Sequence, residues 1–324
     1  MNWSRLAWLG AGILVVALLL TSQPLRRSRL AGPERTGEEP RVQVVVDPDS
    51  GRTEEMPLEE YVQGVVGGEM GRLPSAEGRE EDWPEAAYAA QAILARSFIM
   101  AWLEENPDKP ISVDVTEAQA YRPDNITPVI QRAVESTRGE VIQYRGKPVK
   151  AWFHSYAGGA TASAKEGLNY EAEEPGYVRS VELPENEFAP PDVKDWSMSV
   201  PLGELQEKLA EAGVDVGAVQ DVRIDELGPT GRVTRLTVTG TQGSQSMHGA
   251  EFRLAVGPEV MKSTLVDPGS FRVVEERLVA EGTGFGHGVG LSQWDAYKMA
   301  KEGKSPEEIV EAFFQDIEIV KLWD

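Results

Sequence analysis

One acidic side chain lies where the sequence predicts the buried face of a helix. The apolar residues at positions 58, 61, 62, 65 and 66 have the spacing of one helix face, and the next position on that face is Glu69. Burial raises the pKa of a carboxyl group, as a general acid near neutral pH requires. Glu69 is therefore the candidate catalytic residue. The alternative is that the helix frays at Gly67 and Gly68, which cost about 1 kcal/mol each relative to alanine, so that Glu69 is solvated.

Three other segments carry polar side chains that could bind a polar ligand. The candidates are Gln91 and Arg96 on a second predicted helix, His154 and Ser155 at the end of an apolar strand, and His287, Ser292 and Gln293 in or just after a run in which every second residue is glycine. The alternatives are a buried hydrogen bond for Gln91, a surface ion pair for Arg96 and a tight turn for the glycine run. From single residues these alternatives are at least as good as the binding roles.

Several other chemistries fit the sequence poorly. No G-x-G-x-x-G frame fits the glycine run, H-E-x-x-H is absent, and no G-x-S-x-G surrounds Ser155. The absence of cysteine excludes disulfides, thiol catalysis and cysteine zinc sites. A formal net charge of −21 should repel nucleic acid, whose binding draws on Lys and Arg. We expect no metal, no cofactor and no nucleic-acid partner.

A mixture of helices and hairpin-connected strands must position these residues. Helices are predicted over 58–69, 84–103, 127–137, 202–212, 293–300 and from Ser305 onward, and strands over 42–46, 111–115, 141–144 and 149–154, with a further hairpin turning at 228–231. No strand–helix rhythm repeats, so the fold class is α+β. Residues 196–271 are predicted to form a second lobe or insert, and the two lobes to border a groove.

The N-terminal residues predict a membrane anchor. The run from Leu6 to Leu20 carries no charge and approaches the roughly 17–25 residues of a spanning helix, so residues 1–23 are predicted to be an uncleaved anchor. Residues 24–40 read as a flexible tether, and residues 41–324 as the folded body. Arg26, Arg27 and Arg29 would keep the body in the cytoplasm by the positive-inside rule. We predict an extracytoplasmic body instead, on the functional grounds that follow.

Five segments resemble the stage II sporulation protein D family, and they occur in the family's order. They are residues 58–70, 89–98, 151–159, 175–181 and 284–294. The resemblance implies a lytic transglycosylase that cuts peptidoglycan between N-acetylmuramic acid and N-acetylglucosamine, with Glu69 as its catalytic residue and the other candidates holding the sugar. It also implies a single-pass membrane protein with an extracytoplasmic catalytic domain that acts in forespore engulfment, beside a partner amidase that first strips the peptides from the glycan strands.

The sequence departs from the family at several of these positions. Alanines usually stand where this chain has Gly67 and Gly68, a Ser-Thr-Ser-Gly-Gly type sequence usually stands at 155–159, and a glycine usually stands at Asp295. Some relatives bind zinc near the segment that matches 114–121, which here has neither cysteine nor histidine. Because other members of the superfamily are amidase enhancers, the alternative function is a non-catalytic, wall-binding activator of an N-acetylmuramoyl-L-alanine amidase.

Overall fold

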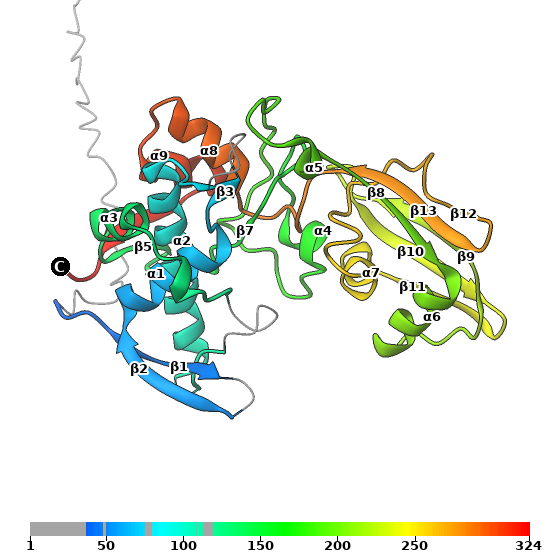
Figure 1. Cartoon of the computed structure of the whole chain (residues 1–324), viewed down its shortest axis with the longest axis horizontal. Helices are drawn as coiled ribbons and strands as arrows, with labels where there is room; N and C mark the ends of the chain where they lie inside the picture. Colours follow the sequence, from blue (N-terminus) through cyan, green and yellow to red (C-terminus); the bar gives the residue numbers. More distant parts are fainter. Residues whose placement is uncertain (1–36, 48–49, 75–79, 108, 113–118) are drawn as a thin grey trace, which may run out of the picture.

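The computed structural model describes residues 37–47, 50–74, 80–107, 109–112 and 119–324, and its elements form two groups (Figure 1). The predicted mixture of helices and strands is confirmed. The first group contains β1 (Arg41–Asp47), β2 (Arg52–Pro57), α1 (Leu58–Glu69), β3 (Leu73–Pro74), β4 (Glu80–Glu81), α2 (Glu85–Glu105), η1 (Pro123–Asn125), α3 (Pro128–Ser136), β5 (Glu140–Tyr144), β6 (Lys147–Pro148), α8 (Gln293–Lys301), α9 (Pro306–Phe313) and β15 (Glu318–Lys321).

The second group has its own hydrophobic core, built from residues between Trp196 and Ala280. Its elements are β8 (Asp195–Pro201), α6 (Leu202–Glu211), β9 (Val219–Leu227), β10 (Val233–Gly240), β11 (Gly243–Met247), α7 (Gly249–Val256), β12 (Arg272–Val274) and β13 (Arg277–Thr283). They form two antiparallel sheets, in the orders β11-β10-β9 and β12-β13-β8. This core covers the stretch predicted as a second lobe, and a groove between the two groups stays a prediction.

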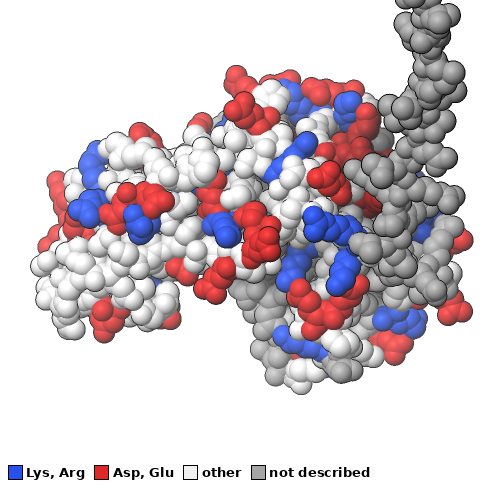
Figure 2. All heavy atoms as spheres, turned by 180° about the vertical axis from the view of Figure 1, so that it is seen from behind, with Lys and Arg blue, Asp and Glu red and all other residues white. Residues whose placement is uncertain are grey.

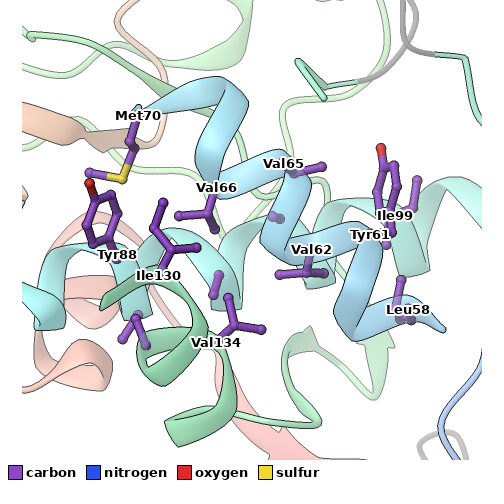
Figure 3. Close-up of a cluster of buried hydrophobic side chains, with 14 of the residues drawn as sticks. Leu58, Tyr61, Val62, Val65, Val66, Met70, Tyr88, Ile99, Ile130 and Val134 are labelled. Atoms are coloured by element: carbon purple, nitrogen blue, oxygen red, sulfur yellow. The ribbon is translucent and has the colours of Figure 1, made fainter. Parts of the chain in front are cut away.

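Helix α1 forms as the apolar spacing predicts. Leu58, Tyr61, Val62, Val65 and Val66 are all fully buried, in one cluster with side chains of α2 and α3 such as Ile99, Ile130 and Val134 (Figure 3). Pro57 precedes the helix, where a residue with a fixed φ and no N–H costs no hydrogen bond. Burial of one such aliphatic side chain is worth about 1.5–3 kcal/mol, so this face holds α1 in place.

Helix α2 is the central helix of the first group. It is long and apolar enough to cross a membrane by composition, but most of its surface is buried inside the protein. We therefore assign its apolarity to the core. The predicted anchor, residues 1–23, lies outside the described residues.

One predicted strand boundary is wrong. A hairpin does turn at Arg145 and Gly146, but its second strand is the short β6, and residues 149–154 do not form one strand; β5 also pairs with β15. The chain leaves that sheet after Pro148 because β7 (Phe153–His154) pairs in parallel with the distant β14 (Leu291–Ser292). The described end of the predicted tether, residues 37–40, is bound to the body, since Glu39 forms an ion pair with Arg138.

Charged side chains cover the outside of both groups. On the face in Figure 2, Lys and Arg are interspersed among Asp and Glu. Many of them form exposed ion pairs, such as that between Arg52 and Glu54. On this face the charge therefore forms a mixed, solvated surface rather than a basic stripe.

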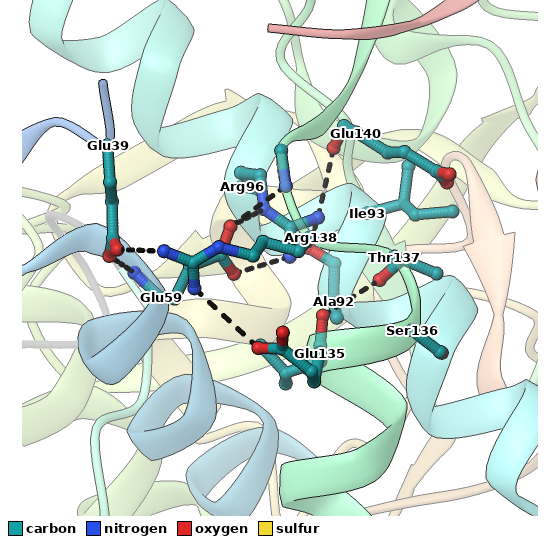
Figure 4. Close-up of polar contacts among 12 residues, drawn as sticks. Glu39, Glu59, Ala92, Ile93, Arg96, Glu135, Ser136, Thr137, Arg138 and Glu140 are labelled. Atoms are coloured by element: carbon teal, nitrogen blue, oxygen red, sulfur yellow. Dashed lines mark hydrogen bonds and ion pairs between the residues drawn. The ribbon is translucent and has the colours of Figure 1, made fainter. Parts of the chain in front are cut away.

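A buried carboxylate joins segments of the first group that are far apart in the sequence (Figure 4). Glu59, near the start of α1, accepts hydrogen bonds from Nε and Nη2 of Arg96 at 3.0 and 2.6 Å. Glu59 also accepts from the backbone N–H of Gly139 and from Nε1 of Trp323, at 3.0 and 2.9 Å. Both members of the ion pair are almost completely buried, with 0% and 5% of their side chains exposed. The carboxylate is thus tied to α2, to the residue before β5 and to the C-terminal segment.

Breaking this pair should cost far more than breaking an exposed one. We expect Arg96→Met to lower the free energy of unfolding by about 3–5 kcal/mol, because it leaves the Glu59 charge buried without its cation. Arg52→Met, which removes an exposed pair whose side chains are 63% and 52% exposed, should change it by less than about 1 kcal/mol. Urea unfolding followed by tryptophan fluorescence measures both. Equal effects would show that the buried pair is not a structural joint.

Candidate active site

Glu69 lies at the C-terminal end of α1, and α1 runs unbroken through Gly67 and Gly68 to reach it. The fraying alternative is therefore wrong. Its Oε1 accepts a hydrogen bond of 2.6 Å from the backbone N–H of Ala120. Burial raises the pKa of Glu69 from 4.5 to about 7, and the Ala120 N–H opposes part of this shift because it stabilises the carboxylate. A carboxyl with this pKa can donate and accept a proton near neutral pH.

The glycine at position 68 is what allows Ala120 to reach Glu69. A Cβ atom on Gly68 would lie 2.4 Å from the carbonyl oxygen of Ala120, too close for any real contact. The backbone at 120–121 thus lies directly on the surface of α1. Without a side chain at this position, another chain segment can approach α1 closely.

The strand pair β7–β14 brings together two segments that are far apart in sequence. His154 pairs with Ser292, and the rings of His154 and His287 lie 5.5 Å apart. A Cβ on Gly286 would lie 2.6 Å from Cβ of His154, so the glycine run packs against that histidine. The two histidine segments therefore form one unit.

Both imidazoles in this unit are held neutral. Burial lowers the pKa of His154 well below 6.5, and it lowers the pKa of His287 to about 3. The nearby charge of Arg232 lowers both further. Nδ1 of His154 contacts the carbonyl of Val289 at 3.2 Å, while its Nε2 is buried without a protein partner. His154 thus keeps one free nitrogen, whereas Nδ1 of His287 accepts the N–H of Val289 at 3.0 Å.

Four other candidates, Gln91, Ser155, Ser292 and Gln293, lie close to the histidines. The hydroxyl of Ser292 accepts the N–H of Ala157 at 3.1 Å and donates to Asp295. Nε2 of Gln293 donates to Oε1 of Gln91 at 3.3 Å. Ser155 is half-buried, and its carbonyl accepts the N–H of Trp294. At least some of the hydrogen-bonding groups of Ser292, Gln293 and Gln91 are therefore bonded within the protein.

Arg96 does not lie with this group. Its side chain is completely buried and paired with Glu59, so no sugar can reach it. The prediction that Arg96 binds the ligand is therefore wrong. The alternative was an ion pair on the surface, and Arg96 does form an ion pair, but in the core. Arg96 lies between Ala95 and Ser97, and these neighbours do not indicate which carboxylate pairs with it.

Two tryptophans connect the end of α1 to the histidine segment. Nε1 of Trp83 donates to the carbonyl of Met70, the residue after Glu69, at 3.2 Å. The rings of Trp83 and Trp294 lie 4.9 Å apart, and Trp294 follows Gln293 on α8. Trp83 was not predicted, because its contact with Trp294 joins residues that are far apart in the sequence.

Arg232, from the turn between β9 and β10, was also missed. It is buried, and its Nη2 donates to the carbonyl of Ala157 at 2.9 Å. Burial lowers its pKa to about 10. A Cβ on Gly288 would lie 2.4 Å from its guanidinium group, so this cation rests on the glycine run beside His287. No motif surrounds Arg232, and only the fold reveals its position.

Comparisons with known proteins agree with the resemblance seen in the sequence. A family model described as "Stage II sporulation protein" matches residues 48–144, and a model described as a domain of unknown function matches residues 184–290. The stage II sporulation protein D of Bacillus amyloliquefaciens is 30% identical over 319 residues, covering 92% of this chain and 84% of that protein.

Two further relatives show the range of the similarity. The stage II sporulation protein D of Bacillus subtilis is 28% identical, covering 82% of this chain and 75% of its own length. The amidase enhancer of the same organism is 24% identical, covering 78% of this chain but 39% of its own length. From the extent and identity of the first match, this chain belongs to the stage II sporulation protein D family.

Proposed function

We propose that this protein is a lytic transglycosylase that cleaves peptidoglycan glycan strands between N-acetylmuramic acid and N-acetylglucosamine. The observation that carries the proposal is the half-buried carboxyl of Glu69, whose pKa burial raises to about 7. Family membership supports an enzyme that acts on the cell wall. The names of the two Bacillus relatives support a role in sporulation, which we take to be forespore engulfment.

A single carboxyl group is enough for this reaction. Hydrolysis of a glycosidic bond ordinarily uses two carboxyl groups, one of which activates water or attacks the sugar. In a transglycosylase the 6-hydroxyl of the muramic acid is the nucleophile and forms a 1,6-anhydro ring. Protonated Glu69 donates its proton to the departing glycosidic oxygen and then accepts the proton of that hydroxyl. The carboxyl ends in the state in which it began.

The geometry supports this pair of roles. The Ala120 N–H binds Oε1 of Glu69 and stabilises the carboxylate that forms in the first half of the reaction. In the histidine segment, the half-buried Ser155 is the group best placed to exchange hydrogen bonds with sugar hydroxyl and N-acetyl groups, because Nε2 of His154 is buried.

The location and partners follow from the same proposal. Peptidoglycan lies outside the cytoplasm, so the proposed reaction requires an extracytoplasmic body, and we propose that residues 1–23 anchor this body to the membrane. Because the substrate is peptide-stripped glycan, an amidase must act first. A reporter fused after Asp324 that is active only in the cytoplasm would contradict this topology.

The amidase enhancer among the relatives supports a second candidate function. In that case the chain binds the wall and stimulates a partner amidase without cutting glycan itself. The two functions differ in whether the Glu69 carboxyl is needed.

Replacing Glu69 distinguishes the two functions. We expect Glu69→Gln to lower release of 1,6-anhydromuramyl products from peptide-stripped glycan by roughly 100- to 10,000-fold, the usual contribution of a general acid or base. Products are measured by mass spectrometry with the full chain in mild detergent. Glu60→Gln, an exposed change on the same helix, is the matched control and should retain activity. Stimulation of an amidase that survives Glu69→Gln, with no glycan products, would favour the enhancer.

The raised pKa of Glu69 predicts the pH dependence of the reaction. The pKa of Glu69 in the folded protein is about 7, above the ordinary 4.5. Glu69 therefore stays protonated between pH 4.5 and pH 7 and loses its proton above about pH 7. We expect kcat/KM to fall about tenfold per pH unit above pH 7. Initial rates between pH 5 and 9 measure this. A decline that begins near pH 4.5 would mean that Glu69 is solvated and is not the acid.

Displacing Ala120 should shift that profile. Gly68→Ala places a methyl group against the Ala120 carbonyl and should break the Ala120–Glu69 hydrogen bond. Because this bond lowers the pKa of Glu69, its loss should move the decline to higher pH. Gly203→Ala is the control, since a Cβ there meets nothing within 4 Å. An unchanged profile in Gly68→Ala would show that Ala120 does not tune the acid.

A further inference from the structure

A row of aromatic rings runs from the end of α1 to the protein surface. The centroids of Trp83 and Trp294 are 4.9 Å apart, those of Trp294 and Tyr297 are 5.4 Å apart, and those of Tyr297 and Phe188 are 5.4 Å apart. Exposure increases along the row, because Trp83 is 5% exposed, Trp294 and Tyr297 are half-buried and Phe188 is 38% exposed. The row therefore begins in the core and ends in solvent.

The exposed end of the row is fixed to the body by buried polar contacts. Asn186 is completely buried, and its Nδ2 donates to the carbonyl of Trp294 and to Oδ1 of Asp295, at 2.8 and 3.0 Å. Its Oδ1 accepts the N–H of Phe188 at 3.0 Å. Asp295 stands where the family usually has glycine, so this chain has an added acceptor beneath the segment that carries Phe188.

Charged groups border the same segment. Nζ of Lys298, on α8, donates to the carbonyl of Glu185 and to Oε2 of Glu187, at 2.7 and 2.8 Å. Aromatic rings with hydrogen-bonding groups at their edges form a typical site for a ligand that is apolar on one face and polar at its rim. A contiguous apolar patch rimmed by polar residues is typical of interaction and ligand-binding sites.

We propose that Phe188, Tyr297 and Trp294 form a binding platform for the sugar rings of the glycan strand. A pyranose ring carries C–H groups on its faces and hydroxyl groups around its rim. The C–H groups contact the negative face of an aromatic ring, and the hydroxyls bind charged or polar side chains nearby.

The row also gives the platform a definite place relative to Glu69. Trp83, at its inner end, binds the carbonyl of Met70, and the N–H of Trp294 binds the carbonyl of Ser155. The row thus joins the platform to the segments that carry Glu69 and the two histidines. The identity of the ligand rests on the proposed function. The platform would bind sugar units other than the two that flank the cleaved bond.

Binding to an inactive variant tests the platform independently of catalysis. The probe is a peptide-free oligomer of alternating N-acetylglucosamine and N-acetylmuramic acid, and the protein is the full chain carrying Glu69→Gln in mild detergent. Isothermal titration calorimetry gives Kd. Phe188→Ala, added to this protein, should weaken binding roughly two- to tenfold, the usual value of one aromatic contact. Phe188→Leu, which keeps an apolar side chain, should weaken it as well.

The control is Leu254→Ala, which removes a 62% exposed apolar side chain from α7 in the second group. It should leave Kd unchanged. Thermal unfolding of each variant shows whether the fold is kept. Equal Kd values with and without Phe188, or equal weakening by Leu254→Ala, would overturn the platform. If binding depends on Phe188 but the protein with Glu69 intact releases no anhydro products, the platform stands and the transglycosylase proposal fails.

Discussion

The first group of elements depends on one buried carboxylate, that of Glu59. Four hydrogen bonds from Arg96, Gly139 and Trp323 converge on it, so it fixes α1 against α2, the start of β5 and the C-terminal segment. Because α1 is a single rigid helix, fixing its first turn also fixes where Glu69 lies at its last. The two glutamates have opposite surroundings, since the charge of Glu59 is neutralised while Glu69 has one backbone N–H. One helix thus carries a structural and a chemical carboxyl.

Local patterns predicted most of the first group. The apolar stripe from Leu58 to Val66 gave α1 and the position of Glu69 at its end. The Ser305–Glu308 capping box is found at the start of α9. Such features depend on residues three or four apart, whose contacts are the same in any fold. The five matching segments also placed the histidines in one family context before any contact between them was known.

Long-range contacts could not be predicted in the same way. The parallel pairing of His154 with Ser292 joins residues more than a hundred positions apart, and two-residue strands have no periodicity to detect. Arg96 lies in α2 and its partner Glu59 lies in α1, so the sequence around Arg96 allowed an ion pair but did not identify the partner. Arg232 reaches the glycine run from a different core altogether. In each case the sequence allows several roles for the residue, and the tertiary fold determines which of them it has.

The departures from the family bear on whether this chain is an enzyme or an enhancer. If the cleft had decayed, the altered positions would be expected to leave gaps or unpaired groups. Instead Gly68 is filled by the backbone of Ala120, whose N–H binds Glu69, and Asp295 is paired with Ser292 and Asn186. These two changes therefore each have a matching partner in the same chain. This pattern favours a site that has been rebuilt around its acid, since a chain that only binds the wall has no need of a carboxyl with a pKa near neutrality.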